Sequence, residues 1–230
     1  MKLKTKDLVL VALFTALVAA LSLVPPIPMP VVPVPVTLQT FGVMLTGLML
    51  GPRRAGLVLM LYVLIALIGI PVLPGGRAGL AVLAGPTGGF LLGMIPGAML
   101  TGWLAGQPTP LSVMTSNSAT FWQIARCWLA SVVGGVLLVY AIGIPWLAWI
   151  AKMDWTKASL LMLAYVPVDL CKALLAALIS QRVHGLHVLA ARVVVILLWL
   201  RTNKRHTVGL YPPCHACVIR MCVDVCVCPL

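Results

Sequence analysis

Residues 165–178 read YVPVDLCKALLAAL, an apolar stretch that contains one acid, Asp169, and one base, Lys172. A helix places these two charges on one face, because they lie three residues apart, and Tyr165 lies on the same stripe one turn earlier. Charged side chains within a membrane span are costly, so they face a bundle interior and mark a functional site by default. This stretch therefore predicts a membrane helix packed among other helices.

The composition of the whole chain also indicates a membrane protein. Of its 230 residues, 62% are apolar and only 9% are charged, whereas an ordinary soluble domain is roughly 25% charged. So few charges would not keep the chain dissolved, which excludes a soluble enzyme. The net charge of +12 comes from sixteen Lys and Arg against four Asp. The basic stretches lack interleaved aromatic side chains and base-reading motifs, so we assign this charge to cytoplasmic loops and anionic lipid rather than to nucleic acid.

Apolar windows interrupted by Gly, Pro and charge predict six membrane-spanning helices. They cover residues 7–24, 37–50, 54–70, 86–105, 119–142 and 157–183. The first begins like a signal peptide, but its apolar run is long for a signal core and no A-x-A cleavage site ends it. The second is short, which is also compatible with a buried or re-entrant helix, and the GPRR turn at 51–54 joins it to the third. The predicted fold is an all-α integral membrane protein, a compact six-helix transmembrane bundle.

The distribution of Lys and Arg in the short loops predicts a multi-pass topology with the N-terminus and the end of the sixth helix in the cytoplasm. In that orientation the basic residues on the inner side are Lys2, Lys4, Lys6, Arg53, Arg54 and Arg182, and those on the outer side are Arg77, Lys152 and Lys157. Arg126 lies near the inner end of the fifth span, where its side chain can extend to the headgroups, so we interpret it as structural.

Two of the outer loops have unusual sequences. Residues 25–36 read PPIPMPVVPVPV, and six prolines without a charge predict an extended, stiff segment that is either a connector or a lid over a pocket. Residues 71–89 are too apolar for a surface loop and too rich in glycine for a plain helix, which predicts a re-entrant or cavity-lining segment. We expect Gly85, Gly88 and Gly89 to adopt positive φ and to let backbone approach a ligand. A tight turn with close helix packing is the alternative.

The charge pair of the sixth span has two interpretations. Asp169 could accept N–H bonds from a ureido or amide group while Lys172 holds a carboxylate, so that the pair binds one ligand. Pro167 would add an acceptor, because its missing N–H frees the carbonyl of Leu163. The alternative is an ion pair that only neutralises itself within the bundle.

Several catalytic patterns are absent from the sequence. There is no G-x-x-x-x-G-K-[ST] motif for holding ATP phosphates, and no Ser-His-Asp or metal-hydrolase pattern occurs in the first 185 residues. We therefore expect a protein that binds rather than one that catalyses, with no cofactor.

Three segments together resemble one known family. They are PVTLQT at 35–40, GPTGGFLLG at 85–93 and PVDLCKALLAAL at 167–178. In this order they resemble the BioY family, the biotin-binding substrate component of energy-coupling factor (ECF) vitamin transporters, over residues 5–185. The resemblance implies a six-helix protein of a bacterial or archaeal plasma membrane with a high-affinity biotin site near the outer face. It also implies a transmembrane scaffold (T component) and two ATPase subunits as partners.

The resemblance assigns roles to particular residues. Asp169 and Lys172 match the ligand-binding acid and lysine of the family, and the glycine block matches the loop beside the ligand. Arg77 could pair with the biotin carboxylate. The complete expected ligand-binding set is Asp169, Lys172, Tyr165, Arg77, Thr87, Gly88, Gly89 and Gln39. The A-x-x-x-A spacing on the first helix matches the scaffold contact, with Ala12, Ala16 and Ala20 in that position.

The resemblance ends near residue 185, which predicts a substrate-binding domain at 1–185 and an extension at 186–230. The extension holds CHAC at 214–217 and three further cysteines. It could bind zinc, but its ligand spacings are irregular, so we expect it to be disordered or partly helical and dispensable for binding. Two other functions stay open: a substrate component for another small vitamin, and a membrane scaffold protein in which the Asp–Lys pair is structural.

Overall fold

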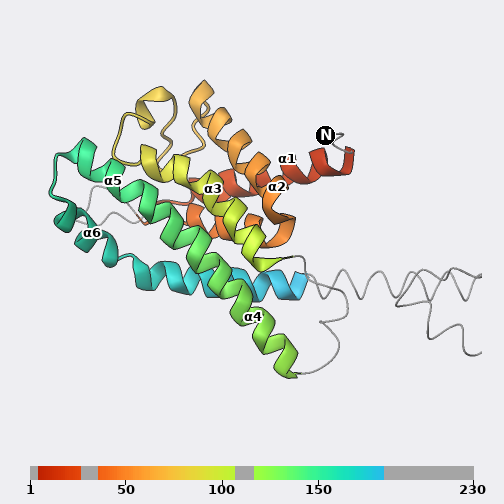
Figure 1. Ribbon diagram of the computed structural model, residues 1–230. Coiled ribbons are helices and arrows are strands. Elements are labelled where there is room, and N and C mark those ends of the chain that lie inside the picture. Colours follow the sequence, from red (N-terminus) through yellow and green to blue (C-terminus); the bar gives the residue numbers. More distant parts are fainter. Residues whose placement is uncertain (1–4, 27–35, 107–116, 184–230) are drawn as a thin grey trace, which may run out of the picture. The chain divides into compact units, whose positions relative to one another are not determined.

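The computed structural model describes residues 5–26, 36–106 and 117–183, all within one unit, Met1–Leu186. The helices are α1 (Thr5–Leu23), α2 (Gln39–Ile68), α3 (Gly88–Ala105), α4 (Asn117–Ser131), α5 (Val139–Ala151), α6 (Trp155–Leu163) and a final helix, Val166–Val183 (Figure 1). Two short segments are the 3-10 turn η1 (Leu80–Val82) and the π-helical segment η2 (Val132–Leu138). Most of the proline-rich segment and all of the extension at 186–230 lie outside the described residues.

Helix α2 consists of two helices joined at a turn. Gly51 has φ 75° and ψ 176°, which no helix accommodates, and Pro52 follows it. The GPRR sequence therefore makes the predicted turn, and the described residues form six helical stretches in the predicted order. Every residue from 42 to 48 is buried, so the short second stretch is surrounded by protein, as one of its two interpretations required.

The fifth and sixth stretches differ from their predicted bounds. Helix α4, η2 and α5 run on as one rod, whose apolar part extends over Phe121–Ala151 (Figure 1). The sixth stretch is broken, because α6 and Val166–Val183 meet at an angle of 49°. The break follows from Pro167, which cannot donate to the carbonyl of Leu163 and whose ring clashes with it.

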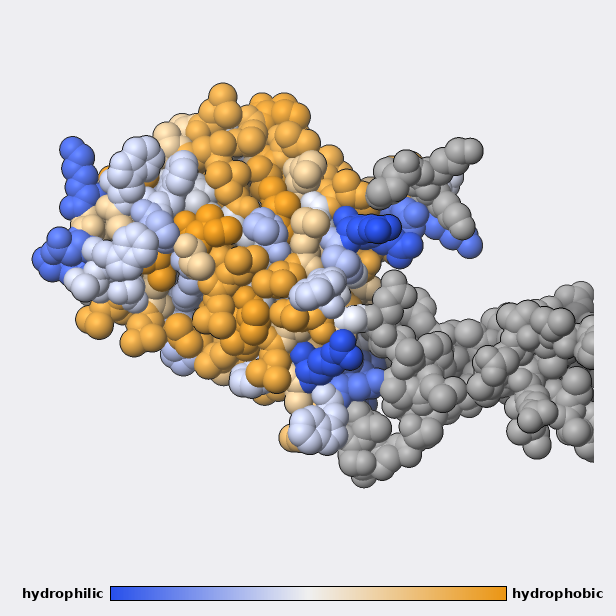
Figure 2. Space-filling model, in the orientation of Figure 1, coloured by the Kyte–Doolittle hydropathy of each residue, from blue (hydrophilic) through white to orange (hydrophobic). Residues whose placement is uncertain are grey.

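The described helices form a multi-pass membrane bundle. Four of them are long and apolar enough to cross a membrane, and the bent pair would make a fifth. Figure 2 shows hydrophilic residues at two opposite ends of the bundle and a hydrophobic surface between them. Asp7 of α1 pairs with Arg54 at 2.7 Å, which places the beginning of α1 and the turn at Gly51 at the same end. This arrangement agrees with the predicted grouping of Lys6, Arg53 and Arg54 on one side.

Helix α3 packs closely on its neighbours through glycines. A Cβ atom at Gly47 of α2 would lie 2.8 Å from the carbonyl oxygen of Ala98, and one at Gly97 would lie 2.8 Å from that of Gly134. A Cβ at Gly102 would lie 2.7 Å from the backbone of Gly51. Small residues at such crossings let helix backbones approach and gain van der Waals contact, which drives helix association in lipid.

Replacing Gly89 at the beginning of α3 tests this packing. The added Cβ of Gly89→Ala would lie 2.3 Å from Cβ of Trp146, and we expect a destabilisation of about 1–3 kcal/mol. Gly93→Ala is the matched control, because its nearest contact would be 3.3 Å, and alanine is the better helix former. Thermal unfolding in detergent, followed by circular dichroism, measures both variants. Equal midpoints for the two variants would contradict the packing described here.

Candidate functional site

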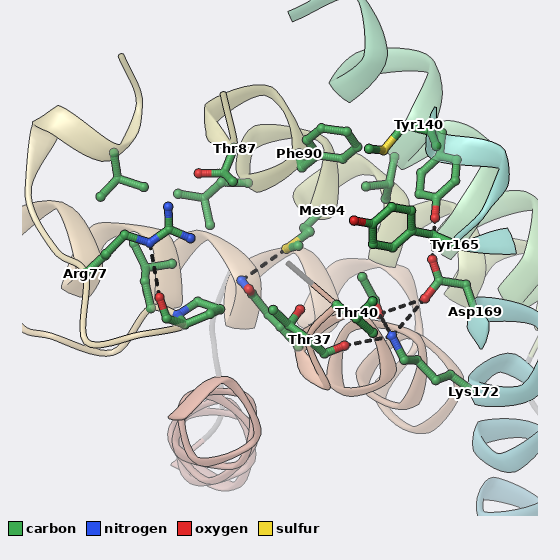
Figure 3. Close-up of a pocket in the computed structure, with 18 residues that line it drawn as sticks. Thr37, Thr40, Arg77, Thr87, Phe90, Met94, Tyr140, Tyr165, Asp169 and Lys172 are labelled. Atoms are coloured by element: carbon green, nitrogen blue, oxygen red, sulfur yellow. Dashed lines mark hydrogen bonds and ion pairs between the residues drawn. The ribbon is translucent and has the colours of Figure 1, made fainter. Parts of the chain in front are cut away.

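A cavity of about 730 Å³, counting the space at its open mouth, lies between α2, α3, α5, α6 and Val166–Val183 (Figure 3). The polar side chains that line it belong to Thr37, Gln39, Thr40, Arg77, Thr87, Tyr140, Tyr165, Asp169 and Lys172. Apolar side chains lie between its two ends, including Leu73, Val82, Phe90, Leu91, Met94, Val139 and Met162. It is therefore an apolar cavity with polar groups concentrated at its two ends.

At one end of the cavity Lys172 is fully hydrogen-bonded. Only 5% of Asp169 and 7% of Lys172 is exposed, and Lys172 Nζ lies 2.9 Å from Asp169 Oδ1. The same ammonium donates to the carbonyl of Thr37 at 2.7 Å and to Thr40 Oγ1 at 3.2 Å. An ammonium group has three donors, so Lys172 has no donor left over for a ligand in this arrangement.

Asp169 receives bonds from three helices. Its Oδ1 atom accepts from Lys172 and from Thr40 Oγ1 at 3.4 Å, and its Oδ2 atom accepts from the Tyr140 hydroxyl at 2.5 Å. The sequence predicted the Asp169–Lys172 pair but missed Thr37, Thr40 and Tyr140 as its partners. Thr40 is the last residue of the PVTLQT segment, so a motif already singled out in the sequence contained this partner of Asp169. Tyr140 had no local signal, because η2 and α5 decide which way it faces.

Arg77 lies at the opposite end of the cavity from this network (Figure 3). A tight turn carries it, in which Leu73 N–H donates to the carbonyl of Arg77 at 3.3 Å, and Gly75 and Gly76 adopt φ of 75° and 70°. Arg77 Nε donates to the carbonyl of Pro74 at 3.1 Å. None of the ion pairs among the described residues includes Arg77. The guanidinium is thus a net positive charge at the cavity, and this loop lines the cavity as predicted.

The backbone conformation of the glycine block, residues 85–89, differs from the prediction. Positive φ occurs at Gly75, Gly76 and Gly79 of the loop rather than at Gly85, Gly88 or Gly89. Gly88 and Gly89 open α3 with helical backbone, and neither lines the cavity. The expectation that these glycines adopt positive φ was wrong, and contact of Gly88 and Gly89 with a ligand stays a prediction.

The glycines of this block are required by packing. A Cβ at Gly88 would lie 2.2 Å from the carbonyl oxygen of Leu83, and Gly89 lies directly under Trp146. Trp146 Nε1 donates to the carbonyl of Gly85 at 3.1 Å. The alternative interpretation, a tight turn with close helix packing, is the observed one, and of residues 85–89 only Thr87 lines the cavity.

The remaining predicted ligand residues lie along the cavity wall. Tyr165 lies in the break between α6 and the final helix, and its side chain is buried. Gln39 is 4% exposed, and its Nε2 atom donates to the sulfur of Met94 at 3.3 Å, which is a weak acceptor. The structure therefore brings six of the eight predicted residues to one cavity, all except Gly88 and Gly89. Their contact with a ligand stays a prediction.

The alanines of α1 lie on the face of that helix that the other described helices leave uncovered. Ala12, Ala16 and Ala20 are exposed, whereas the buried residues of α1 are Val11, Thr15, Val18 and Ser22. Arg126 donates from Nε to the carbonyl of Leu104 at 3.1 Å, near the end of α3, which agrees with a structural role. Within the described ranges no group of three or more His, Cys, Asp or Glu could hold a metal, and the cysteines of 186–230 lie outside these ranges.

Comparison with known proteins gives one consistent result. The BioY family model matches residues 1–187. The chain is 42% identical over 191 residues to the biotin transporter BioY of Rhizobium etli, covering 83% of this chain and all of the relative. It is 38% identical over 181 residues to the probable biotin transporter BioY of Bacillus subtilis, covering 79% of this chain and 91% of the relative.

A solved structure gives the same result. It is the crystal structure of the S-component for biotin from an ECF-type ABC transporter, with 30% identity and a TM-score of 0.68. The match covers 79% of this chain and 94% of that one.

The charge pair can be tested by removing one partner. Lys172→Leu leaves the Asp169 carboxylate buried without its ammonium, and we expect a loss of about 3–5 kcal/mol in stability. Adding Asp169→Asn to the same variant removes the unpaired charge and should recover part of that loss. Thermal unfolding in detergent without ligand measures both.

Lys157→Ala is the matched control, because Lys157 and Asp154 form another i,i+3 pair, at 3.6 Å, whose side chains are 71% and 75% exposed. An exposed pair contributes about 1 kcal/mol or less. Equal losses for Lys157→Ala and Lys172→Leu would show that burial adds nothing to the Asp169–Lys172 pair.

Proposed function

The chain belongs to the BioY family, and we propose that it is the biotin-binding substrate component of an ECF transporter. It binds biotin within the membrane for uptake and catalyses no reaction. The single observation that carries this function is the cavity, which joins a buried acid–base network at one end to a guanidinium without an acidic partner among the described residues at the other. A multi-pass bundle in the plasma membrane of a bacterium or archaeon is the matching location.

The chemistry of biotin fits the two ends of the cavity. Biotin has a ureido group with two N–H donors and one carbonyl, an apolar bicyclic ring, and a carboxylate at the end of a tail. Asp169 offers acceptors at one end, and Phe90 and Met94 offer apolar contact between the ends. Burying the ring and satisfying its polar edge at low dielectric supplies the free energy of binding.

The hydrogen bonds of Lys172 and Arg77 support placing the two polar groups of biotin at different ends. Lys172 donates all three of its N–H bonds to Thr37, Thr40 and Asp169. It therefore orients Asp169 rather than binding the carboxylate of biotin. Arg77 has no acidic partner among the described side chains, and a guanidinium bonds carboxylate oxygens with favourable geometry. The ureido group therefore lies at the Asp169 end and the carboxylate at Arg77, which revises the expectation for Lys172.

The membrane orientation follows from charge and from the position of the cavity. The turn at Gly51 and the beginning of α1 share one end of the bundle through the Asp7–Arg54 pair. Thr37, Arg77 and Thr87 lie on connections at the other ends of these helices. With the basic end in the cytoplasm, the cavity opens toward the outer face, where biotin arrives.

The partners proposed for uptake are a transmembrane T component and two ATPase subunits. The exposed Ala12, Ala16 and Ala20 give α1 a surface of small side chains on which another helix can pack closely. Release of biotin toward the cytoplasm requires these partners to reorient the bundle, since this chain has no motif for holding ATP.

The two alternatives are disfavoured by specific observations. The relatives whose names state a ligand are biotin transporters, which disfavours another vitamin. A scaffold with a structural Asp–Lys pair would seal that pair against protein, whereas Asp169 and Lys172 both line the cavity.

Biotin binding to the purified chain in detergent tests the function directly. We expect saturable binding of biotin, and Arg77→Gln should weaken it about 10- to 100-fold because a charge-assisted contact is lost. Biotinamide, which lacks the carboxylate, should bind the wild type and Arg77→Gln with similar affinity. Isothermal titration measures all four combinations.

Lys157→Gln removes an exposed lysine away from the cavity and serves as the control. If the wild-type chain binds no biotin, the proposed function is wrong. If Arg77→Gln weakens biotin and biotinamide equally, the assigned orientation of the ligand is wrong.

Partner binding is tested at the α1 surface. Ala16→Trp places a large side chain in the alanine stripe and should abolish copurification with the T component and cellular biotin uptake, while biotin binding by the purified chain persists. Leu13→Trp is the control, because Leu13 is exposed on the same helix but already large. Normal uptake by the Ala16→Trp variant would exclude this surface as the scaffold contact.

A further inference from the structure

Tyr140 lies at the Asp169 end of the cavity, although the sequence analysis gave it no role. It is the second residue of α5, it lines the cavity, and its hydroxyl donates to Asp169 Oδ2 (Figure 3). The tyrosine ring packs edge-on against Phe90, with the centroids 6.1 Å apart and an interplanar angle of 86°. The phenol oxygen therefore stands next to the carboxylate oxygen on which the proposed ligand depends.

Local structure fixes the position of this ring. The π-helical segment η2 ends at Leu138, one residue before α5 begins. A π turn holds more residues than an α turn, so it rotates all following side chains about the helix axis. Gly143 then lies under Phe90, where a Cβ would approach the ring to 2.3 Å. This close packing holds Phe90 against Tyr140 and turns the hydroxyl toward Asp169.

The groups around Asp169 differ in how freely they can change partners. Lys172 is held by three acceptors, and Thr40 both donates to Asp169 and accepts from Lys172. Among the residues that the structure describes, the Tyr140 hydroxyl is hydrogen-bonded to Asp169 alone. A phenol O–H rotates about its C–O bond without moving the ring. The Tyr140 hydroxyl is thus the group that can release Asp169 Oδ2 at the smallest cost.

We infer that Tyr140 is a specificity-determining residue. When a ligand binds, the Tyr140 hydroxyl stops donating to Asp169 Oδ2, which then accepts from a ligand N–H. The hydroxyl donates instead to the neighbouring carbonyl of the ligand. This inference rests on the proposed function. In a five-membered cyclic urea the N–H and C=O bonds point the same way, so one edge presents a donor beside an acceptor. Asp169 and Tyr140 present an acceptor beside a donor. The pair therefore selects ligands with a cyclic urea or lactam edge.

This exchange of hydrogen bonds explains why the buried Asp169 carboxylate does not destabilise the site when no ligand is bound. Asp169 Oδ2 is hydrogen-bonded before the ligand arrives, and it is hydrogen-bonded again afterwards by the ligand. A buried acceptor left empty would cost roughly the desolvation of that group. A ligand with the N–H donor but a poor acceptor in place of C=O would leave the released Tyr140 hydroxyl without a partner, and it would bind weakly.

The test combines one protein change with one ligand change. Tyr140→Phe keeps the ring against Phe90 and removes the hydroxyl. 2-Thiobiotin keeps both N–H groups but presents a sulfur, which is a weak acceptor. We expect Tyr140→Phe to lower the ratio of the biotin affinity to the 2-thiobiotin affinity about 10- to 100-fold, because only biotin offers the released hydroxyl a good acceptor. Titration calorimetry or ligand competition in detergent measures the four affinities.

Tyr62→Phe is the matched control. The Tyr62 hydroxyl is also buried, but it bonds Ser22 and the carbonyl of Val72 outside the cavity lining. Its removal should change the affinities of both ligands by the same factor. Because both ligands keep their carboxylate, any shift of the Arg77 loop cancels in the comparison.

The outcomes separate this inference from the proposed function. A wild-type chain that does not bind biotin overturns the proposed function, and the inference with it. Biotin binding with an unchanged ratio of the two affinities in Tyr140→Phe overturns the inference alone. If Tyr140→Phe is not monodisperse, replacement of Tyr140 by 3-fluorotyrosine gives a stronger donor. It should tighten biotin relative to 2-thiobiotin, and an unchanged ratio would overturn the inference.

Discussion

Asp169 and Lys172 are two opposite charges in the interior of a membrane bundle, and every group they present must be satisfied by protein or ligand. The 2.9 Å ion pair alone does not achieve this, because Lys172 retains two further donors and Asp169 a second oxygen. Thr37, Thr40 and Tyr140 supply the missing partners from two other parts of the chain. The positions of α2, α5 and the final helix therefore depend on this one network.

Close packing around α3 and local departures from α-helix make that network possible. Pro167 breaks the sixth stretch just before Asp169, so the final helix takes its own direction, and Trp128 Nε1 donates to the carbonyl of Leu170 at 3.3 Å. The π-helical segment η2 turns Tyr140 inward. Such irregular backbone is tolerated at membrane depth only where protein or a cavity surrounds it. Here the irregularities lie beside the cavity, where they direct polar groups inward.

Two features of the site carry different parts of the function. In the proposed function, the Asp169–Lys172 network selects the hydrogen-bonding groups of the ligand at one end, and the charge of Arg77 attracts its carboxylate at the other. The apolar wall between them, with Phe90 and Met94, provides binding free energy without preference for direction. A ligand with a polar cyclic edge and a distant carboxylate would satisfy both ends at once, and the proposed function rests on this separation of roles.

The membrane class, the order of six helical stretches, the Gly51 turn and the Asp169–Lys172 pair could all be predicted from local sequence features. These follow from hydropathy, proline and glycine chemistry and helical spacing, which act over a few residues. Three other features became visible in the folded chain: Gly88 and Gly89 serve packing, all three donors of Lys172 are used, and Tyr140 faces Asp169. These depend on which side chains from distant segments meet, and so on helix crossings and a π turn that no local pattern encodes.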